Sequence, residues 1–542
     1  MKQSKETQLS QETINQVSKI FGKQLRLVET DKNETKFTFN FKSSLILLKD
    51  DKNQEYILKE VLSDYLNFYG TELFLKGLSQ FIDSCNPLKN QFLTYNKTIT
   101  GNYFVKITEP NVQDKHYCLI PFQENEKYNE SKDQIQATAT AHADMNLKLK
   151  NLDPNVTEFF ETNFNNGPFL RDQPILDLFS QVELKLENST KQKNYSKKFM
   201  RNLKLGLDLA KTQLEKIPDN LFQNLPKQLT HKDIFPGNIL YKQDNSVTII
   251  DPDEFMYITR LRDVVYALWC FGARRADASL ISPNPEIMKI YLDSYQQIDS
   301  LTTEEIRLIP QMAIRIWVED LLNFALNVEF TENQIYELER KVQHLKNAIS
   351  GQTVLKLIKY DLIIFAFDGT IGKLDINWKS LKTELATHFK NNHNKIVDFT
   401  GYSTGCTLAY DLLGEVGFQD CLPISKRFEE AGLSGVTFNN KAIRYVKSFS
   451  GKKVVWTSNF ASIVHQALKT ENIDEEFITI IGREQTRRLK PELDGYNVLS
   501  NIFEQKNLQK INPKKTLFIG NSLSDSEAAE KIGCEYLDIS QL

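Results

Sequence analysis

The 542-residue chain has only six cysteines, and none of them stands in a CxxC or other paired spacing. Scattered cysteines in a chain of this length are typical of reduced thiols in a cytoplasmic protein, which argues against a disulfide framework. The first residues lack the apolar stretch of a signal peptide, and the longest apolar run, near Val264 to Ala273, is too short to span a bilayer. We therefore predict a cytoplasmic protein with no membrane partner, although export by a route that needs no such signal stays open.

The chain also lacks an excess of charge of either sign. Its formal net charge is -3, so no basic field indicates binding to nucleic acid. No cluster of histidine and cysteine suggests a metal-binding role of its own. Hydrophobic residues make up 41% and charged residues 25% of the chain, which is typical of globular proteins. A chain of this length exceeds one ordinary core, so we expect two or three domains.

No internal repeat, low-complexity tract or Pro/Gly-rich linker divides the sequence, but its periodicity changes twice. After an N-terminal extension (1–24), short alternating runs predict a β-rich lobe that ends near residue 125. Helical periodicity dominates from there to about residue 350. From residue 356 to 542, compact apolar strands alternate with helices, which indicates βαβ units and a parallel sheet.

The segment "LTHKDIFPGNILYKQDNSVTIIDPDEF" concentrates polar groups between apolar runs. His231, Asp233 and Asn238 follow the pattern H-x-D-x-x-x-x-N, and Asp251 follows the predicted strand "VTII". Phosphoryl transfer from a nucleotide needs a carboxylate to accept the proton of the acceptor hydroxyl, and further oxygen ligands to hold Mg²⁺ against the phosphates. A hairpin would bring Asn238 and Asp251 to one cleft.

This segment resembles the aminoglycoside phosphotransferase and choline kinase family, relatives of protein kinases that phosphorylate small molecules. The family pattern is H-G-D-x-x-x-x-N followed by I-D-W-[DE], and this chain has Lys232 and Pro252 in place of the glycine and the tryptophan. The resemblance covers roughly residues 25 to 345 and implies a two-lobed α+β kinase-like domain (25–350) that uses ATP and Mg²⁺. It implies the roles of five residues: Asp233 as catalytic base, Asn238 and Asp251 as metal ligands, and His231 and Asp263 as structural residues of the catalytic loop.

The β-rich lobe should supply the lysine that neutralises nucleotide phosphate. Lys59 ends the predicted strand "EYILKEV", and Glu72 on the following helix is its expected ion-pair partner. The family hinge falls near Pro121, Phe122 and Gln123, whose backbone groups would receive adenine. The phosphate loop has no glycine, but Ser43 and Ser44 offer hydroxyls and amides there.

The region from 356 to 542 contains four motifs in the order found in haloacid dehalogenase-like phosphatases, which it resembles. "FAFDGT" provides Ala366 and Asp368, and "VVWTSN" provides Thr457. "RLKPELDGY" provides Lys490, and "TLFIGNSLSDSEAA" provides Asn521 and Asp525. The resemblance implies an α/β Rossmann-like parallel-sheet domain with a small helical cap at about 372–437.

The first aspartate of that family is the nucleophile and a metal ligand, and here its position holds Ala366. A usual acidic ligand is replaced by the amide of Asn521. Because a methyl group can neither attack phosphorus nor bind a metal, we predict a degenerate, nearly inactive phosphatase site.

These observations favour an ATP- and Mg²⁺-dependent kinase of a small-molecule hydroxyl acceptor, fused to a phosphatase-like domain that does little or no hydrolysis. Two alternatives stay open: a bifunctional kinase–phosphatase of one metabolic pathway, and a pseudoenzyme or effector that binds a nucleotide or protein. The sequence identifies neither the acceptor nor the oligomeric state.

Overall fold

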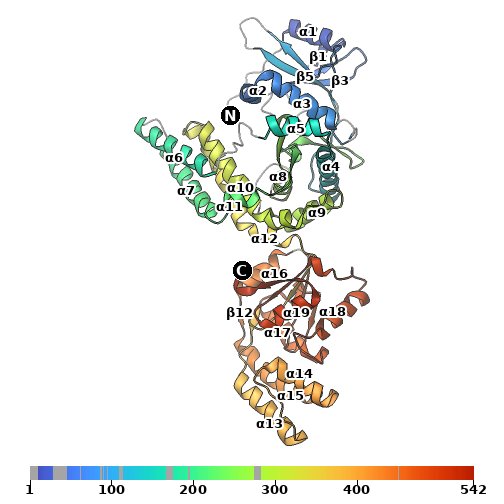
Figure 1. The fold of residues 1–542 in the computed structure, drawn as a ribbon, viewed down its shortest axis with the longest axis vertical. Coiled ribbons are helices and arrows are strands. Elements are labelled where there is room, and N and C mark those ends of the chain that lie inside the picture. Colours follow the sequence, from blue (N-terminus) through green and yellow to red (C-terminus); the bar gives the residue numbers. More distant parts are fainter. Residues whose placement is uncertain are drawn as a thin grey trace. The chain divides into compact units, whose positions relative to one another are not determined.

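A computed structural model of the protein describes residues 10–28, 45–61, 63–85, 88, 91–93, 95–108, 114–165, 175–192, 196–273, 282–449 and 451–541. The chain forms two compact units, Met1–Lys356 and Leu357–Leu542. Each unit has its own sheet and hydrophobic core, and each is described separately below (Figure 1).

The first unit begins with a five-stranded antiparallel sheet in the order β1-β2-β3-β5-β4. Its strands are β1 (Arg26–Leu27), β2 (Leu45–Lys49), β3 (Glu55–Glu60), β4 (Phe104–Ile107) and β5 (Lys115–Pro121). Asp50 closes the β2–β3 turn by accepting hydrogen bonds from the amides of Lys52 and Gln54 at 3.0 and 2.8 Å. In "EYILKE", Tyr56 and Leu58 are buried while Glu55 and Ile57 are partly exposed, the period of two expected of a strand that buries one face.

Helix α1 (Gln11–Phe21) lies within the predicted N-terminal extension and packs into the core of this sheet. Ser10 caps the helix by accepting a hydrogen bond from the Thr13 amide, and Gly22 ends it in the left-handed conformation. Ile14 and Val17 share one hydrophobic cluster with Leu48 of β2 and Leu58 of β3. The apolar face of α1 is therefore part of the lobe.

Helices dominate the rest of the first unit, with two small two-stranded sheets among them in its described part (Figure 1). The helices are α2 (Ser63–Tyr69), α3 (Thr71–Cys85), α4 (Lys132–Lys150), α5 (Pro154–Asn163), α6 (Ile175–Gln192), α7 (Lys197–Leu214), α8 (Arg260–Gly272), α9 (Pro285–Gln296), α10 (Thr303–Asn327), α11 (Ile335–Ser350) and α12 (Gln352–Leu357). One small sheet pairs β6 (Lys227–Thr230) with β9 (Met256–Thr259), and between them in the chain β7 (Ile239–Tyr241) forms a hairpin with β8 (Val247–Ile249). The β-rich lobe and the helical lobe together give the predicted kinase-like architecture.

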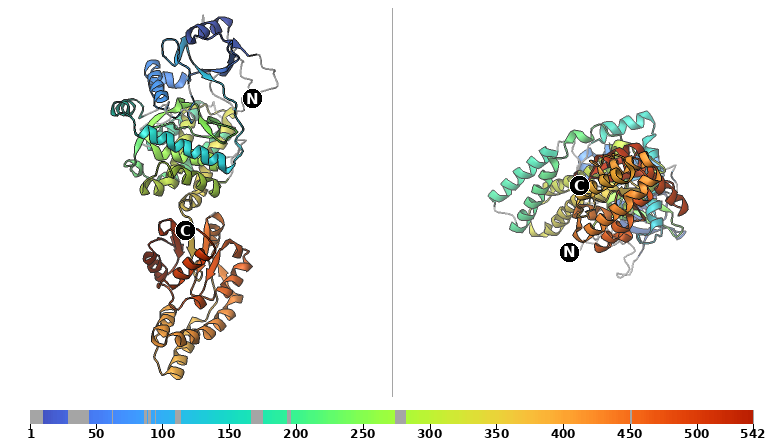
Figure 2. Two further views of the ribbon diagram at one scale, coloured as in Figure 1. Left: turned by 90° about the vertical axis from the view of Figure 1, so that its right-hand side faces the viewer. Right: turned by 90° about the horizontal axis from the view of Figure 1, so that it is seen from below.

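The second unit contains a parallel sheet in the order β14-β13-β10-β15-β16. Its strands are β10 (Leu362–Phe365), β13 (Lys452–Trp456), β14 (Thr479–Ile481), β15 (Thr516–Gly520) and β16 (Glu535–Asp538). Helices α16 (Asn440–Ser448), α17 (Ala461–Thr470), α18 (Asp494–Gln505) and α19 (Leu523–Ile532) connect or flank these strands (Figure 2). The central strand β10 is buried on both faces, as its continuous apolar run predicts. This is the predicted Rossmann-like domain.

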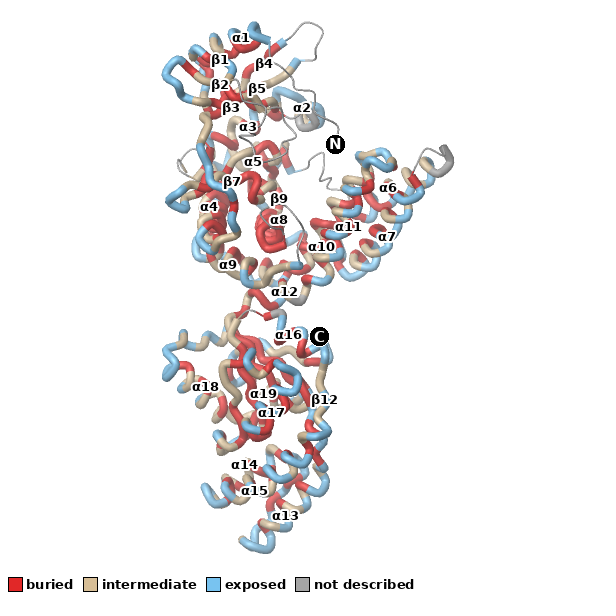
Figure 3. Tube along the Cα trace, turned by 180° about the vertical axis from the view of Figure 1, so that it is seen from behind, coloured by how far each residue is buried: buried red, intermediate tan, exposed pale blue. Residues whose placement is uncertain are grey.

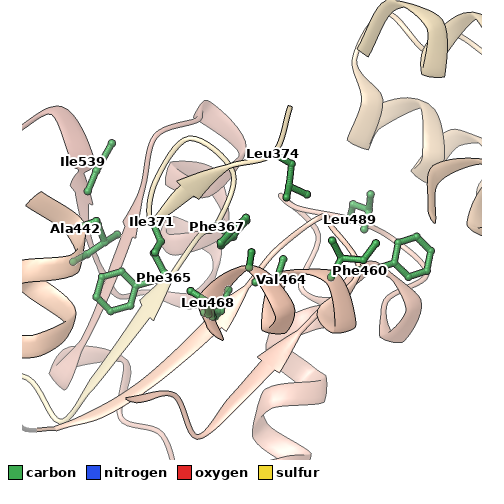
Figure 4. Close-up of a cluster of buried hydrophobic side chains, with 14 of the residues drawn as sticks. Phe365, Phe367, Ile371, Leu374, Ala442, Phe460, Val464, Leu468, Leu489 and Ile539 are labelled. Atoms are coloured by element: carbon green, nitrogen blue, oxygen red, sulfur yellow. The ribbon is translucent and has the colours of Figure 1, made fainter. Parts of the chain in front are cut away.

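A helical cap is inserted after β10, between the two short paired strands β11 (Gly372–Lys373) and β12 (Thr437–Phe438). It consists of α13 (Trp378–His393), α14 (Tyr402–Leu413) and α15 (Glu415–Gly432), which extend to one side of the sheet (Figures 1 and 3). A continuous hydrophobic cluster joins the sheet to the cap. Figure 4 shows part of it, with Phe365, Phe367 and Leu374 beside Val464 and Phe460. Across the described part of both units, every helix is too short or too polar to pass through a membrane.

Candidate active site

The segment 229–255 folds so that its polar residues meet at one end of the β7–β8 hairpin. Ile239 pairs with Ile249 in that hairpin, and the Ile250 amide donates to the Asn238 carbonyl at 3.0 Å. Asn238 and Asp251 therefore occupy adjacent strand ends, as the sequence predicts. Asp251 has a φ of 61° and Lys232 a φ of 69°, a left-handed conformation that costs a residue with a side chain roughly 1–2 kcal/mol. The phosphotransferase pattern has glycine at the latter position, where that cost is absent.

Asp233 is held by two hydrogen bonds. The side-chain amide of Asn238 donates to its Oδ2 at 2.8 Å, and the Tyr266 hydroxyl donates to its Oδ1 at 3.0 Å. Burial and the nearby carboxylates of Glu254 and Asp251 raise the pKa of Asp233 to about 7. This carboxyl group thus changes protonation state near neutral pH, which suits a group that accepts a proton during a reaction.

A buried network fixes the loop that carries Asp233. Nε2 of His231 donates to the Ile250 carbonyl at 2.9 Å, which links the loop to the end of β8. The Lys232 amide donates to Asp263 Oδ1 at 2.8 Å, and Asp263 Oδ2 lies 2.7 Å from Nε2 of His142. Burial would raise the pKa of Asp263, but the histidines outweigh it and hold that pKa below its usual value. His231 and Asp263 therefore both hydrogen-bond to the backbone around this loop, and the structural role that the resemblance implies for them stays a prediction.

Lys59 lies buried beside this hairpin, with its ammonium between Asp251 and Asp253. It forms a short ion pair with Asp251 and lies 2.8 Å from Asp253 Oδ2. The predicted ion pair between Lys59 and Glu72 is wrong in this structure, because Glu72 lies exposed in the first turn of α3. A buried ammonium needs the nearest carboxylates to offset its desolvation, and the hairpin provides two of them.

The other predicted nucleotide-binding residues are those of the hinge and of the phosphate loop. The Phe122 amide donates to the Glu55 carbonyl at 2.9 Å, so it extends the β3–β5 ladder, and Pro121 has no N–H to offer. Oε1 of Gln123 is buried without a hydrogen-bond partner among the described residues. Ser43 and Ser44 lie outside the described residues.

The parallel register of the second unit brings its four motifs to one sheet edge. Phe365 of β10 pairs with Val455 of β13 and with Ile519 of β15. Residues that follow these strands, among them Asp368, Thr457 and Asn521, therefore leave the sheet at the same edge. The described contacts agree, because Thr370 Oγ1 donates to Asn521 Oδ1 at 3.2 Å, and a side chain at Gly369 would collide with the Asn521 amide.

Lys490 and Asp525 form a buried, short ion pair at this edge, and the Lys490 ammonium also donates to the Trp456 carbonyl at 3.0 Å. Burial would raise the pKa of Asp525, but Lys490 holds it below its usual value. Burial raises the pKa of Asp368, whose Oδ1 accepts a hydrogen bond from the Leu374 amide at 3.3 Å. The Thr457 hydroxyl donates to Asn459 at 2.8 Å.

Ala366 occupies the strand end where the phosphatase pattern has its nucleophile. Its buried methyl group belongs to an apolar cluster with Ile364, Trp456 and Phe518. The Lys490 ammonium lies over the rings of Trp456 and Phe518, at 5.8 and 5.4 Å from their centroids. At position 366 an apolar surface therefore stands where a carboxylate would be required.

Sequence reasoning missed several residues of the first site. Asp253 occupies the acidic fourth position of the I-D-W-[DE] pattern, in "IDPD". The motif itself therefore marked this residue as part of the site. The Lys232 ammonium is buried 3.3 Å from Glu254. Tyr266 and His142 come from α8 and α4, far from the motif in the sequence, and no local pattern marks them.

Comparisons with known proteins agree with the two-unit organisation. Residues 103–297 match the family model described as "Phosphotransferase enzyme family", and residues 363–539 match "Haloacid dehalogenase-like hydrolase". Among curated proteins, none matches this chain.

Solved structures with a similar fold include an amicoumacin kinase in complex with AMP-PNP and Ca²⁺. It is 14% identical, covers 62% of this chain and 93% of its own, and gives a TM-score of 0.43. An aminoglycoside phosphotransferase from Alicyclobacillus acidocaldarius is 11% identical over 66% of this chain and 97% of its own, with a TM-score of 0.41. An ethanolamine kinase from Plasmodium vivax is 13% identical over 62% of this chain and 83% of its own, with a TM-score of 0.36. By these two matches, residues 103–297 are similar to the phosphotransferase enzyme family and residues 363–539 are similar to haloacid dehalogenase-like hydrolases, one in each unit.

Proposed function

We propose that the first unit transfers the γ-phosphoryl group of ATP to a hydroxyl group of a small molecule, in a Mg²⁺-dependent reaction. The observation that carries this proposal is the geometry of one carboxylate. Asp233 is held by Asn238 and Tyr266, has a pKa of about 7, and lies on the same hairpin end as Asp251. A carboxylate held in this way orients an acceptor hydroxyl and takes its proton as the new bond to phosphorus forms.

Lys59, Asn238, Asp251 and Asp253 fit the binding of a metal–nucleotide complex. The Asn238 amide nitrogen donates to Asp233, which leaves its oxygen as the atom that a metal would use. Mg²⁺ prefers such oxygen ligands and would neutralise charge on the phosphates. The Lys59 ammonium now balances Asp251 and Asp253, the charges that a dication would otherwise balance. With a bound Mg²⁺ balancing these two aspartates, Lys59 would be available to neutralise phosphate oxygens of the nucleotide.

The second unit, on this proposal, binds a phosphorylated ligand or regulates the kinase, and does not hydrolyse phosphate esters. The apolar surroundings of Ala366 support this, because no carboxylate stands where an aspartyl phosphate must form. The remaining groups, Asp368, Lys490 and Asp525, keep the polar edge of the site intact without supplying a nucleophile.

The test is ADP formation by the full chain with Mg·ATP and a panel of amino alcohols, aminoglycosides, sugars and nucleosides. We expect acceptor-dependent ADP formation with one class, and a phosphorylated product whose mass rises by one phosphoryl group. Failure of the wild-type chain to bind Mg·ATP in calorimetry would overturn the kinase proposal and favour the pseudoenzyme. Hydrolysis of an aryl phosphate that disappears in Asp368→Asn would instead favour the bifunctional enzyme.

A further inference from the structure

Two histidines and an aspartate converge in the helical cap, away from the strand-end site of the second unit. Nε2 of His388 lies 3.0 Å from Oδ2 of Asp420, and Nε2 of His393 makes a short contact with the same oxygen. One ligand atom from each of the three residues lies within 4.8 Å of the others. All three side chains are partly buried, with 22–29% of their surface exposed.

The cluster arises from packing between α13 and α15. His388 and His393 lie five residues apart on α13, which separates them by about 140° around an ideal helix. His393 is the last residue of that helix, and Asn394 then turns the chain in the left-handed conformation. Asp420 comes from the facing helix α15. The spacing alone therefore gives no metal-binding motif, and only the packed cap brings the three groups together.

We propose that His388, His393 and Asp420 bind a transition-metal ion, with Zn²⁺ the best match. Two imidazole nitrogens and one carboxylate oxygen are a ligand set that Zn²⁺ uses in tetrahedral sites, at roughly 2.0–2.2 Å from each ligand. Ligand atoms of such a site lie about 3.4 Å from one another, as follows from those bond lengths. Small side-chain movements from the present distances are enough to admit the ion, which takes the place of the protons now shared with Asp420.

Asn392 adds an orienting group. Its side-chain Nδ2 lies 3.1 Å from Nδ1 of His388 and holds the ring in place. With this amide turned over, its oxygen would accept the Nδ1 proton and leave Nε2 for a metal. A polar partner on the second imidazole nitrogen is what metal-bound histidines usually have.

An open groove of about 860 Å³ adjoins the cluster. His388 and Asn392 form part of its wall, together with Lys379, Thr383, Thr387 and Asn391. With three protein ligands, a tetrahedral ion keeps its fourth position for water or for a donor atom of a molecule in this groove. The site is independent of the kinase chemistry, so its test does not depend on the proposed function.

The experiment is a Zn²⁺ titration of the full chain, first stripped of metal with a chelator, in calorimetry. We expect one equivalent to bind to the wild type, and His393→Gln or Asp420→Asn to weaken that binding by about 100-fold or more, because loss of a direct ligand exceeds the loss of an outer partner. Zn²⁺ should also raise the unfolding temperature of the wild type and leave that of the variants unchanged.

His465→Gln is the matched control, because His465 lies 3.6 Å from Asp474 on the same unit but belongs to no group of three possible metal ligands among the described residues. It should bind Zn²⁺ like the wild type. Equal Zn²⁺ affinity of the wild type and the His393→Gln/Asp420→Asn double variant would overturn the proposal. Circular dichroism of the metal-free variants checks their folding. If they unfold, Co²⁺ replaces Zn²⁺ in the wild type, where the visible absorption of a tetrahedral ion supports the site and its absence at one equivalent overturns it.

Discussion

Each unit of this chain buries a lysine against aspartate, and the two sites differ in what stands beside that pair. Lys59 lies between Asp251 and Asp253. In the same site, Asp251 is one of the charges that raise the pKa of Asp233 to about 7. Lys490 pairs with Asp525, next to the methyl group of Ala366. Both sites keep a buried ion pair, but the second site has the methyl group of Ala366 at the position where the phosphatase pattern has its nucleophilic carboxylate.

The comparison separates what a fold needs from what a reaction needs. The parallel sheet of the second unit is stabilised by apolar strands such as "LIIF" and by the cluster that joins them to the cap. Replacing one carboxylate at a strand end by a methyl group removes nothing from that core. Loss of a nucleophile is therefore compatible with an intact fold, and each of the following experiments tests the contrast between the two sites.

The largest effect is expected from Asp233→Asn. The amide keeps the shape of the site but accepts no proton, so kcat should fall by about 10²–10⁴-fold while nucleotide affinity changes little. Steady-state kinetics and calorimetry with Mg·ATP measure the two quantities. Asp244→Asn is the control, because Asp244 is an exposed residue in the β7–β8 turn. Equal activity of Asp233→Asn and the wild type would remove Asp233 from the reaction.

Lys59→Met should come next, because it leaves Asp251 and Asp253 without their cation. Breaking a buried ion pair costs about 3–5 kcal/mol of folding free energy, and the variant should also bind Mg·ATP more weakly. Denaturant unfolding followed by fluorescence measures the first effect. Lys115→Met is a matched control in the same sheet, since its pair with Glu60 is partly exposed and should contribute no more than about 1 kcal/mol. Equal losses of unfolding free energy in both variants would show that the buried Lys59 ion pair contributes no more to stability than the partly exposed one of Lys115.

Restoring the acidic groups of the second site should produce hydrolysis. We expect the Ala366→Asp/Asn521→Asp variant to hydrolyse an aryl phosphate on the order of 10²-fold faster than the wild-type chain, which lacks the nucleophile. A generic chromogenic phosphate ester provides the measurement. Adding Asp368→Asn to the double variant should abolish the gain. If the wild type already hydrolyses the ester as fast as the double variant, the site was never degenerate.

The smallest expected effect is on pH dependence. Burial and neighbouring carboxylates raise the pKa of Asp233 to about 7, so the group becomes the carboxylate that accepts a proton only as the pH rises through that value. The kcat/KM for Mg·ATP should therefore rise by roughly 10-fold per unit at acidic pH and level off above pH 7. Between about pH 4 and 7, Asp233 therefore holds its proton in the folded state and has lost it in the unfolded state. Its contribution to the free energy of unfolding should fall as the pH rises through this range. A flat rate profile from pH 5.5 to 8 would contradict this assignment.

The sequence alone determined the elements and the motifs, because these depend on local pattern. The period of two in "EYILKE" places β3, and the continuous run "LIIF" places the buried strand β10. The motif H-x-D-x-x-x-x-N with Asp251 identified the cluster at the β7–β8 hairpin, because a hairpin brings its two strand ends together. The convergence of Asp368, Thr457 and Asn521 followed in the same way, because parallel strands end at one edge of the sheet.

Only the tertiary structure decided which groups touch across elements. Lys59 pairs with Asp251 and Asp253 rather than with Glu72, since the buried ammonium meets whichever carboxylates the packing places nearest. Tyr266 of α8 donates to Asp233, and His142 of α4 contacts Asp263, which accepts from the Lys232 amide. His388, His393 and Asp420 meet only because α13 packs against α15. Contacts between distant segments depend on the packing of whole helices and sheets, and no local period records that packing.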